Sequence, residues 1–253
     1  MDLELTNRVF VVTAASSGLG RATAEQLVAE GARVVLVARR GEILAEVVEA
    51  LGREQAVALT ADLADPSTAE ETCALALTTF GRLDGALISV GGPPAGTVLD
   101  TTPDQWRGAF DSVFLAGLRV ADAVVRQGTA PDLALAWVLS TSVKAPIPGL
   151  AASNGLRPGL AMLIKQLADE LGPSGTRVLG LMPGRIETER VQHLDNLAED
   201  PRAARTAAEA SIPLRRYGEP AEFGRVAAFV LSPAASYLTG SMIAVEGGAL
   251  RSL

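Results

Sequence analysis

Residues 13–20, Thr-Ala-Ala-Ser-Ser-Gly-Leu-Gly, have the composition of a phosphate-binding turn. They follow a short apolar run at 9–13 and precede a segment with helical spacing at 21–30. Glycine lets a backbone approach a phosphate closely, and a helix N-terminus presents free N–H groups and a positive dipole. The position between a strand and a helix favours a pyrophosphate-binding turn over a turn that merely needs two glycines. The residues expected to form this site are Thr13, Ala15, Ser16, Ser17, Gly18, Leu19 and Gly20.

Two adjacent arginines follow the next apolar run, at residues 33–38. An acidic residue at the end of this strand would bind the ribose hydroxyls of NAD and repel a 2′-phosphate. This chain instead has Ala38 followed by Arg39 and Arg40, whose planar guanidinium groups pair well with phosphate. The sequence therefore favours NADP(H) over NAD(H). Two solvated arginines at a strand exit are the alternative interpretation.

Side chains able to exchange a proton are few in this chain. The sequence has two tyrosines, Tyr217 and Tyr237, a single histidine, His193, and two lysines, of which one is Lys144. The one cysteine, Cys73, excludes an internal disulfide and offers no metal-binding constellation. The choice of a general acid is therefore narrow, and no metal site is predicted.

The segments that would position these residues alternate between short apolar strands and amphipathic helices. The Val- and Leu-rich strands lack alternation, as is typical of parallel strands covered by helices on both faces. Because no linker or repeat divides the 253 residues, we predict one doubly wound (Rossmann) α/β domain with a parallel sheet of about seven strands. Strands are predicted at 9–13, 33–38, 56–60, 85–89, 135–140, 177–182 and 243–245. Helices are predicted at 21–30, 42–51, 66–80, 103–126, 160–171 and 220–231.

Residues 187–217 form the longest interval without a strand pattern. The interval is alanine-rich and charged, has helical spacing, and follows a predicted strand end. Insertions after strand C-termini lie over the ligand crevice of an open α/β sheet. A substrate lid is one interpretation of this segment, and a solvated helical hairpin is the other.

Taken in order, these motifs resemble those of the short-chain dehydrogenase/reductase family, of the 3-oxoacyl-[acyl-carrier-protein] reductase-like kind, over the whole chain. The glycine-rich turn matches T-G-x-x-x-G-x-G except at Ala14, which replaces the first glycine and is tolerated if its φ stays negative. Residues 183–188 match P-G-x-I-x-T, and residues 245–248 resemble the terminal strand of the family. The resemblance implies further cofactor contacts from Asp62, Leu63, Ser89, Gly91, Pro183, Gly184, Ile186 and Thr188.

The resemblance also implies a catalytic asparagine, serine, tyrosine and lysine, in which the lysine makes the tyrosine a usable acid. The Y-x-x-x-K positions fall on Ser153 and Arg157, and the asparagine position falls on Val113. The serine is assigned to Ser142, with Ser140 as the fallback. An alkyl hydroxyl holds its proton far more tightly than a phenol, and an arginine does not release its proton in a protein. The standard acid of the family is therefore missing.

Other groups would have to complete a reaction in this site. Ser142 would bind a carbonyl oxygen, and Arg157 would hold the nicotinamide ribose. Water, Lys144 or His193 would supply the proton, although a solvated surface position is the favoured interpretation of each of these two side chains. Pro158, Gly155 and Gly159 disfavour a helix here, so the fifth long helix is expected to begin late, within residues 154–158.

Two functions remain compatible with these residues. The first is an NADP(H)-dependent oxidoreductase that acts on a carbonyl or hydroxyl group of a 3-oxoacyl-like substrate by a non-standard proton path. The second is a dinucleotide-binding sensor, or the non-catalytic partner subunit of an active relative. A remnant that no longer binds cofactor is a third possibility, against which the glycine-rich turn argues.

Composition limits the partners and the location of the protein. The net charge of −7 argues against a general binder of nucleic acid or of anionic membranes. The uncharged stretch 226–245 is interrupted by Ser-Pro and Thr-Gly-Ser, which disfavours a membrane helix, and the acidic start lacks the pattern of a secretory signal. We expect a cytoplasmic protein whose partner is a small-molecule substrate or an acyl carrier. The resemblance implies a homodimer or homotetramer.

Overall fold

A single parallel sheet organises the chain in the computed structural model, which describes residues 1–252. The strand order is β3-β2-β1-β4-β5-β6-β7, so the direction of progress along the sheet reverses between β1 and β4. The predicted doubly wound α/β fold is therefore confirmed. The strands are β1 (Val9–Thr13), β2 (Arg33–Ala38), β3 (Ala56–Thr60), β4 (Gly85–Ile88), β5 (Ala134–Val138), β6 (Arg177–Pro183) and β7 (Met242–Val245).

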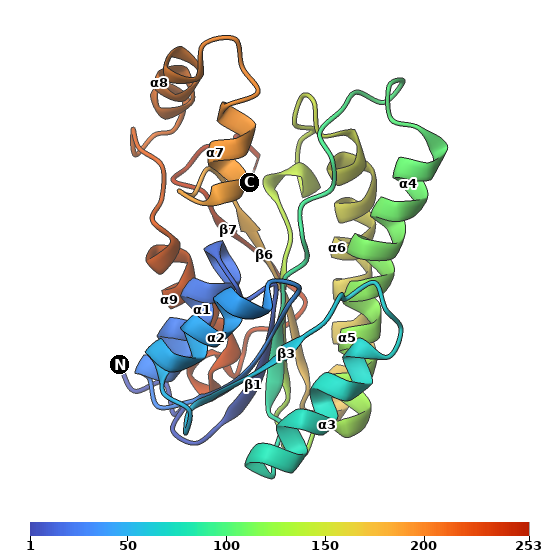
Figure 1. Ribbon diagram of the computed structural model, residues 1–253, viewed down its shortest axis with the longest axis vertical. Helices are drawn as coiled ribbons and strands as arrows, with labels where there is room; N and C mark the ends of the chain where they lie inside the picture. The colour runs from blue at the N-terminus through green and yellow to red at the C-terminus, as the bar shows by residue number, and fades with distance from the viewer. Residues whose placement is uncertain (253) are drawn as a thin grey trace.

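Helices cover both faces of this sheet (Figure 1). One layer contains α1 (Gly18–Ala29), α2 (Gly41–Leu51) and α9 (Pro220–Leu231). The other contains α3 (Thr68–Phe80), α5 (Ala116–Gln127) and α6 (Ala151–Leu171). Short 3-10 turns lie at Thr141–Val143, Gly172–Ser174 and Pro233–Ala235.

The two layers explain why the strands are apolar without alternation. In β1, Phe10 and Val12 belong to the core cluster on one face, and Val9 and Val11 belong to the cluster on the other. All four side chains are fully buried. Burial on both faces of a parallel sheet favours continuous Val, Leu and Ile runs, as the sequence indicated.

The helix predicted over residues 103–126 contains an irregularity. It consists of α4 (Pro103–Ala109), a π-helical segment (Phe110–Leu115) and α5 in direct succession. Thr102 begins it with a capping box, in which its hydroxyl accepts from the N–H of Gln105. Val113 lies in the π-helical segment and is fully buried, so the position expected for an asparagine contributes no polar group to the interior.

The expected late start of the fifth long helix is wrong, because α6 begins at Ala151 and contains Pro158 in its interior. Asn154 fixes the first turn: its side-chain oxygen accepts from the N–H of Ile147 at 3.0 Å, and its side-chain amide donates to the carbonyl of Ile147 at 2.9 Å. Its own N–H donates to the carbonyl of Leu150 at 2.9 Å. These hydrogen bonds to the loop directly before the helix override the propensity of Gly155, Pro158 and Gly159 against a helix.

The glycines of α6 serve its packing. A Cβ atom at Gly155 would lie 3.1 Å from the ring of Trp106, and one at Gly159 would lie 3.2 Å from the ring of Phe114. Small residues at both positions therefore let α6 approach α4 and the π-helical segment, together called the α4 region (Pro103–Leu115), closely.

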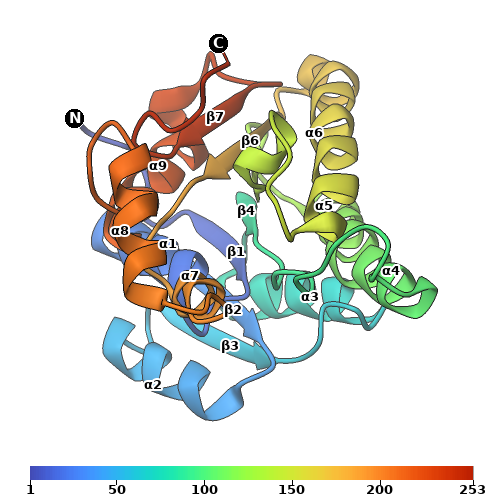
Figure 2. The same cartoon turned by 90° about the horizontal axis from the view of Figure 1, so that it is seen from above.

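The segment 187–217 stands over the carboxyl ends of the strands as α7 (Glu189–Asp195) and α8 (Pro201–Ser211) (Figures 1 and 2). Two contacts of Asp195 hold α7 at its C-terminal end. Asp195 forms an ion pair with Arg185 and accepts a hydrogen bond from the hydroxyl of Tyr217 at 3.0 Å. Within residues 1–252, no helix has both the length and the apolar character needed to span a membrane.

Candidate active site

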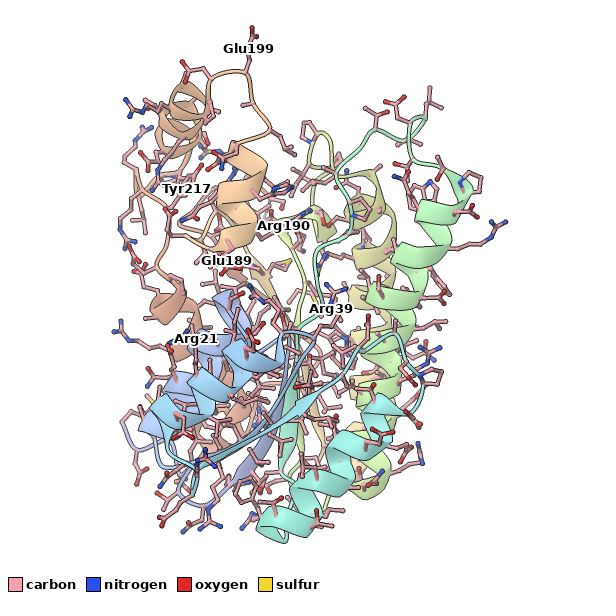
Figure 3. All side chains as sticks on the ribbon, viewed as in Figure 1. Arg21, Arg39, Glu189, Arg190, Glu199 and Tyr217 are labelled. Atoms are coloured by element: carbon pink, nitrogen blue, oxygen red, sulfur yellow. The ribbon has the colours of Figure 1, made fainter. Side chains whose placement is uncertain are left out.

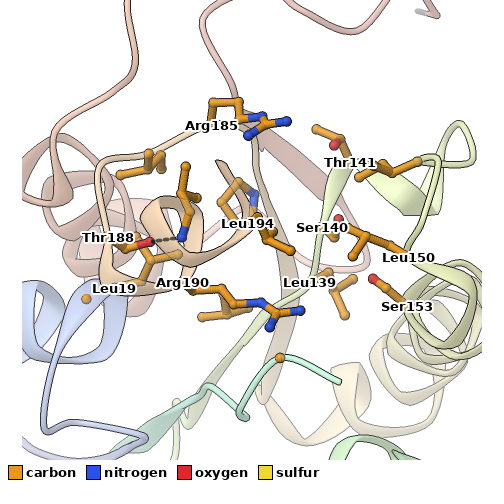
Figure 4. A pocket seen from close by; sticks show the side chains of 18 of the residues that line it. Leu19, Leu139, Ser140, Thr141, Leu150, Ser153, Arg185, Thr188, Arg190 and Leu194 are labelled. Carbon is orange, nitrogen blue, oxygen red and sulfur yellow. Dashed lines mark hydrogen bonds between the residues drawn. The ribbon is translucent and has the colours of Figure 1, made fainter. Parts of the chain in front are cut away.

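A cavity of about 900 Å³ opens at the carboxyl edge of the sheet, where β1 and β4 diverge. Its wall combines the glycine-rich turn, the loop after β4, the end of β5, the first turns of α6, the exit of β6 and α7 (Figure 4). Ligands of doubly wound proteins bind at this reversal of strand order. The cavity is therefore the place where the predicted site residues should gather.

The glycine-rich turn is tightly closed against the first turn of α1. A Cβ at Gly20 would lie 2.6 Å from the carbonyl oxygen of Ala14, so only glycine permits this approach. Ala14 has φ of +51°, which shows that the expected negative φ is wrong. An L-residue in this left-handed conformation costs about 1–2 kcal/mol. The turn keeps the geometry of a glycine-rich loop although its first glycine is absent.

Thr13 has a structural role in the turn. Its hydroxyl donates to the carbonyl of Ser89 at 2.5 Å and accepts from the N–H of Ser89 at 2.8 Å. Both residues are buried. This pair of hydrogen bonds ties the end of β1 to the end of β4 and so positions the loop that carries Gly91.

Many of the residues predicted to bind cofactor share the cavity wall, and the others lie outside it. On the wall are Ser17, Gly18, Leu19, Gly20, Ser89, Gly91, Arg157, Pro183, Gly184, Ile186 and Thr188. Outside it are Thr13, Ala15, Ser16, Arg39, Arg40, Asp62 and Leu63.

Arg40 lies beside the glycine-rich turn and is already held there. Its guanidinium donates to the hydroxyls of Ser16 at 3.1 Å and Ser17 at 2.6 Å, and it pairs with Glu189 of α7 at 3.1 Å. Arg39 is more exposed and lies 3.8 Å from the carboxylate of Asp62. Two arginines, each paired with a carboxylate, therefore flank the turn.

The segment aligned with the catalytic motif brings two serines together. The hydroxyls of Ser142 and Ser153 lie 3.1 Å apart, and both residues are buried. Ser153 lines the cavity, whereas Ser142 is not among the residues that line it, and the role of Ser142 toward a substrate stays a prediction. Ser140, the fallback, lines the cavity, and its hydroxyl accepts from the N–H of Ser142 at 3.1 Å.

Arg157 is a buried cation on the cavity wall. Its Nη1 atom donates to the carbonyl oxygens of Val138 at 2.7 Å and Leu139 at 2.9 Å, at the end of β5. Burial, with a smaller contribution from the nearby Arg190, lowers the pKa of Arg157 to about 10. The guanidinium is therefore still charged at neutral pH, and it holds the end of β5 through backbone contacts.

The structure separates the remaining proton donors. Lys144 is exposed and does not line the cavity, whereas His193 of α7 does. Tyr217 lies outside the cavity wall, against Asp195 and under the guanidinium of Arg205, and burial raises the pKa of its phenol. Tyr237 is fully exposed. Among the described residues, therefore, neither tyrosine substitutes for the missing phenol. Nor do those residues include a group of three or more His, Cys, Asp or Glu side chains arranged to hold a metal ion.

One functional candidate was missed by the sequence, namely Arg190 of α7. Its Nη2 atom donates to the carbonyl of Pro93 at 2.7 Å across the cavity, and its Nε would lie 2.7 Å from a Cβ at Gly92. In Figure 4 its side chain extends from α7 toward the wall formed by Leu139 and Ser153. Nothing in the sequence placed residues 187–217 relative to the loop after β4, so no local pattern revealed this contact.

Comparisons with known proteins agree with this geometry. Residues 13–249 match the family described as Enoyl-(Acyl carrier protein) reductase. The chain is 32% identical over 251 residues to 2,5-dichloro-2,5-cyclohexadiene-1,4-diol dehydrogenase of Sphingobium indicum, covering 97% of this chain and 98% of that protein.

Solved structures resemble the fold over its full length. The L-sorbose reductase of Gluconobacter frateurii, in complex with NADPH and L-sorbose, superimposes with a TM-score of 0.92 at 27% identity and covers 100% of both chains. An NADPH-bound short chain oxidoreductase of Pseudomonas aeruginosa PAO1, described as containing an atypical catalytic center, gives a TM-score of 0.90 at 30% identity and covers 98% of this chain and 99% of that one. From its motifs, its strand order and these similarities, the chain belongs to the short-chain dehydrogenase/reductase family of oxidoreductases.

Proposed function

We propose that this protein is an NADP(H)-dependent oxidoreductase that acts on a carbonyl or hydroxyl group of a 3-oxoacyl-like substrate, free or carried on an acyl carrier, by a non-standard proton path. The observation that carries the proposal is a single cavity wall shared by the glycine-rich turn, the hydroxyls of Ser140 and Ser153, and the cation of Arg157. When bound, the cofactor would supply or accept the hydride.

The glycine-rich turn and the two arginines beside it can together bind the phosphates of such a cofactor. Because Gly20 has no Cβ, the N-terminus of α1 can pack close to Ala14 in the turn. The free N–H groups of α1 can there bind a pyrophosphate. Arg39 and Arg40 flank the turn and favour a 2′-phosphate. Asp62 and Leu63 would lie beside the adenine, and Ile186 and Thr188 beside the nicotinamide.

The same wall can orient a carbonyl oxygen. Ser140 and Ser153 would donate hydrogen bonds to it, while Ser142 holds the hydroxyl of Ser153 in place from behind. The fixed charge of Arg157 would stabilise negative charge that develops on that oxygen, because a preorganised cation acts strongly where water is excluded. Since Lys144 lies outside the wall, water or His193 is the better proton source.

A second function, a dinucleotide-binding sensor or the non-catalytic partner subunit of an active relative, is favoured by one observation. Among the described residues that line the cavity there is no phenol, and Arg157 is already bonded to the backbone of β5. Such a protein would bind cofactor without turnover.

Two measurements test these functions in turn. Titrations of NADPH and NADH fluorescence should give tight binding with NADPH preferred, and Arg40→Gln should reduce that preference. Steady-state oxidation of NADPH with 3-oxoacyl and small ketone substrates should then be lowered by Ser153→Ala. Binding without turnover on any substrate would favour the sensor, and no binding at a large excess of either cofactor would refute both functions.

We also propose that copies of the chain associate through the outer faces of the α4 region and α6. Phe110 of this region is 41% exposed, and Met162 of α6 is 71% exposed. Apolar side chains at these positions suit a twofold interface. Light scattering should show a dimer or tetramer that Met162→Glu weakens, and a monomer at all concentrations would refute the interface.

A further inference from the structure

The cavity wall has an imbalance of charge. Among the described residues that line it, the charged side chains are the cations of Arg157, Arg185 and Arg190 and the carboxylate of Glu189. Glu189 pairs with Arg40 outside the wall, and Arg185 pairs with Asp195. Within residues 1–252, therefore, Arg157 and Arg190 are left without a carboxylate partner.

Arg190 is the one of these two that is free to bind a ligand. Both described hydrogen bonds of Arg157 use Nη1 to hold the end of β5, and the residue is buried. Arg190 is half-buried, and its single described hydrogen bond, from Nη2 to the carbonyl of Pro93, leaves most of its N–H donors unused. Glycine at position 92 gives the guanidinium room to lie against the loop.

The position of Arg190 connects it to the reacting groups. It extends across the cavity toward the wall that carries Ser140 and Ser153 (Figure 4). In Figure 3 it lies apart from Tyr217, whose hydroxyl donates to Asp195 at the C-terminal end of α7 and which is absent from the cavity wall. A ligand whose oxygen contacts Ser153 would therefore present its other end to Arg190.

Arg157 and Arg190 are cations without carboxylate partners among the described residues, and they share the same partly dehydrated cavity, so they repel each other. An anion bound between them would offset the unfavourable energy of this repulsion. Carboxylate matches the planar guanidinium through two parallel hydrogen bonds. A neutral ketone offers no such compensation. The electrostatics of the cavity thus select for an anionic ligand.

We propose that Arg190 determines specificity by binding a free carboxylate of the substrate, so that the substrate class is oxo or hydroxy carboxylic acids. The inference rests on the proposed function in that the same cavity receives the substrate, and it narrows the 3-oxoacyl-like class to the free acids, because an acyl group carried as a thioester has no free carboxylate. It can be tested separately, because binding of the acid does not require turnover. Neutral ketones and esters of the same length should bind more weakly.

A binding experiment without chemistry tests this assignment. The probes are 3-oxobutanoate and its methyl ester, titrated by calorimetry into the protein with saturating NADP⁺, which cannot reduce them, and into the protein alone. The wild-type protein should bind the acid about 10- to 100-fold more tightly than the ester, the range expected for hydrogen bonds between charged groups. Arg190→Gln should abolish the difference, and Arg190→Lys should restore part of it.

A matched control is Arg202→Gln, which removes an arginine of α8 that does not line the cavity. It should leave the preference for the acid unchanged. Equal affinities of the wild-type protein for acid and ester would overturn the proposal. So would an Arg190→Gln variant that loses affinity for NADP⁺ while keeping the acid preference, because Arg190 would then serve the cofactor. Failure of the proposed function alone would appear as tight, Arg190-dependent binding of the acid with no oxidation of NADPH.

Discussion

Replacing Gly20 by alanine tests the packing on which the cofactor site depends. An added Cβ would lie 2.6 Å from the carbonyl oxygen of Ala14 and 2.9 Å from that of Thr13. Both contacts are shorter than van der Waals separation and involve backbone atoms that cannot rotate away. The turn and α1 would therefore have to move apart, and overpacking of this kind costs about 1–3 kcal/mol.

The loss should be visible in two properties of the Gly20→Ala variant. Each kcal/mol lowers the melting temperature of a chain of this size by about 2–4 °C, so calorimetry should show a decrease of about 2–12 °C. The displacement also moves the N–H groups that face the pyrophosphate. The dissociation constant for NADPH should rise by at least about tenfold, which corresponds to about 1.4 kcal/mol.

Gly172→Ala is the matched control, because Gly172 does not line the cavity and a Cβ there would meet no atom within 4 Å. It should keep the NADPH affinity of the wild-type protein and should not lower its melting temperature. A Gly20→Ala variant with both properties unchanged would refute the described closure of the turn. Equal losses in the two variants would show that the losses do not depend on the close approach of Gly20 to Ala14.

Three further changes have defined outcomes. Ala14→Gly removes the strain of a left-handed backbone conformation at this residue. Chemical denaturation should show a free energy of unfolding that is higher by about 1 kcal/mol. An unchanged or lower free energy would contradict the φ of +51°. Ser153→Tyr combined with Arg157→Lys restores a phenol beside an ammonium group. The rate of ketone reduction, measured as NADPH oxidation, should rise at least about 100-fold. A folded, NADPH-binding variant with no gain in rate would show that the missing phenol does not limit the reaction. Burial raises the pKa of the Cys73 thiol to about 12, so the reactive thiolate is scarce in the native protein at pH 8. The native protein should therefore react with a disulfide reagent at least about 100-fold more slowly than the unfolded chain, in which the thiolate is more abundant. Equal rates would contradict this burial.

Local patterns predicted most of the fold. The strands Val9–Thr13, Arg33–Ala38 and Ala56–Thr60 and the helix Pro220–Leu231 have the predicted bounds, because apolar runs and helical spacing report directly on burial against a sheet. The glycine-rich turn was recognised for the same reason, since its glycines lie between a strand and a helix. The absence of a Tyr-x-x-x-Lys motif is likewise a fact of the sequence.

Residue propensities failed where specific contacts within a loop or turn outweigh them. Pro158 and two glycines argued against a helix start before residue 154, but Asn154 is anchored by the backbone of Ile147, and α6 begins at Ala151. Ala14 adopts a positive φ because the approach of Gly20 and the hydrogen bonds around the turn impose it. Such constraints arise from the closed turn and cannot be read from the residue types alone.

The sequence by itself determined that this chain is a doubly wound α/β domain with a glycine-rich turn and without a Tyr-x-x-x-Lys motif, because periodicity, glycine spacing and residue identity are local properties. Only the tertiary structure decided that Ser142 lies behind Ser153, that Lys144 and Tyr217 lie outside the cavity wall, and that Arg190 reaches the cavity. The physical reason is that these relations join segments far apart in the chain, and their packing across the sheet edge fixes which side chains face the same space.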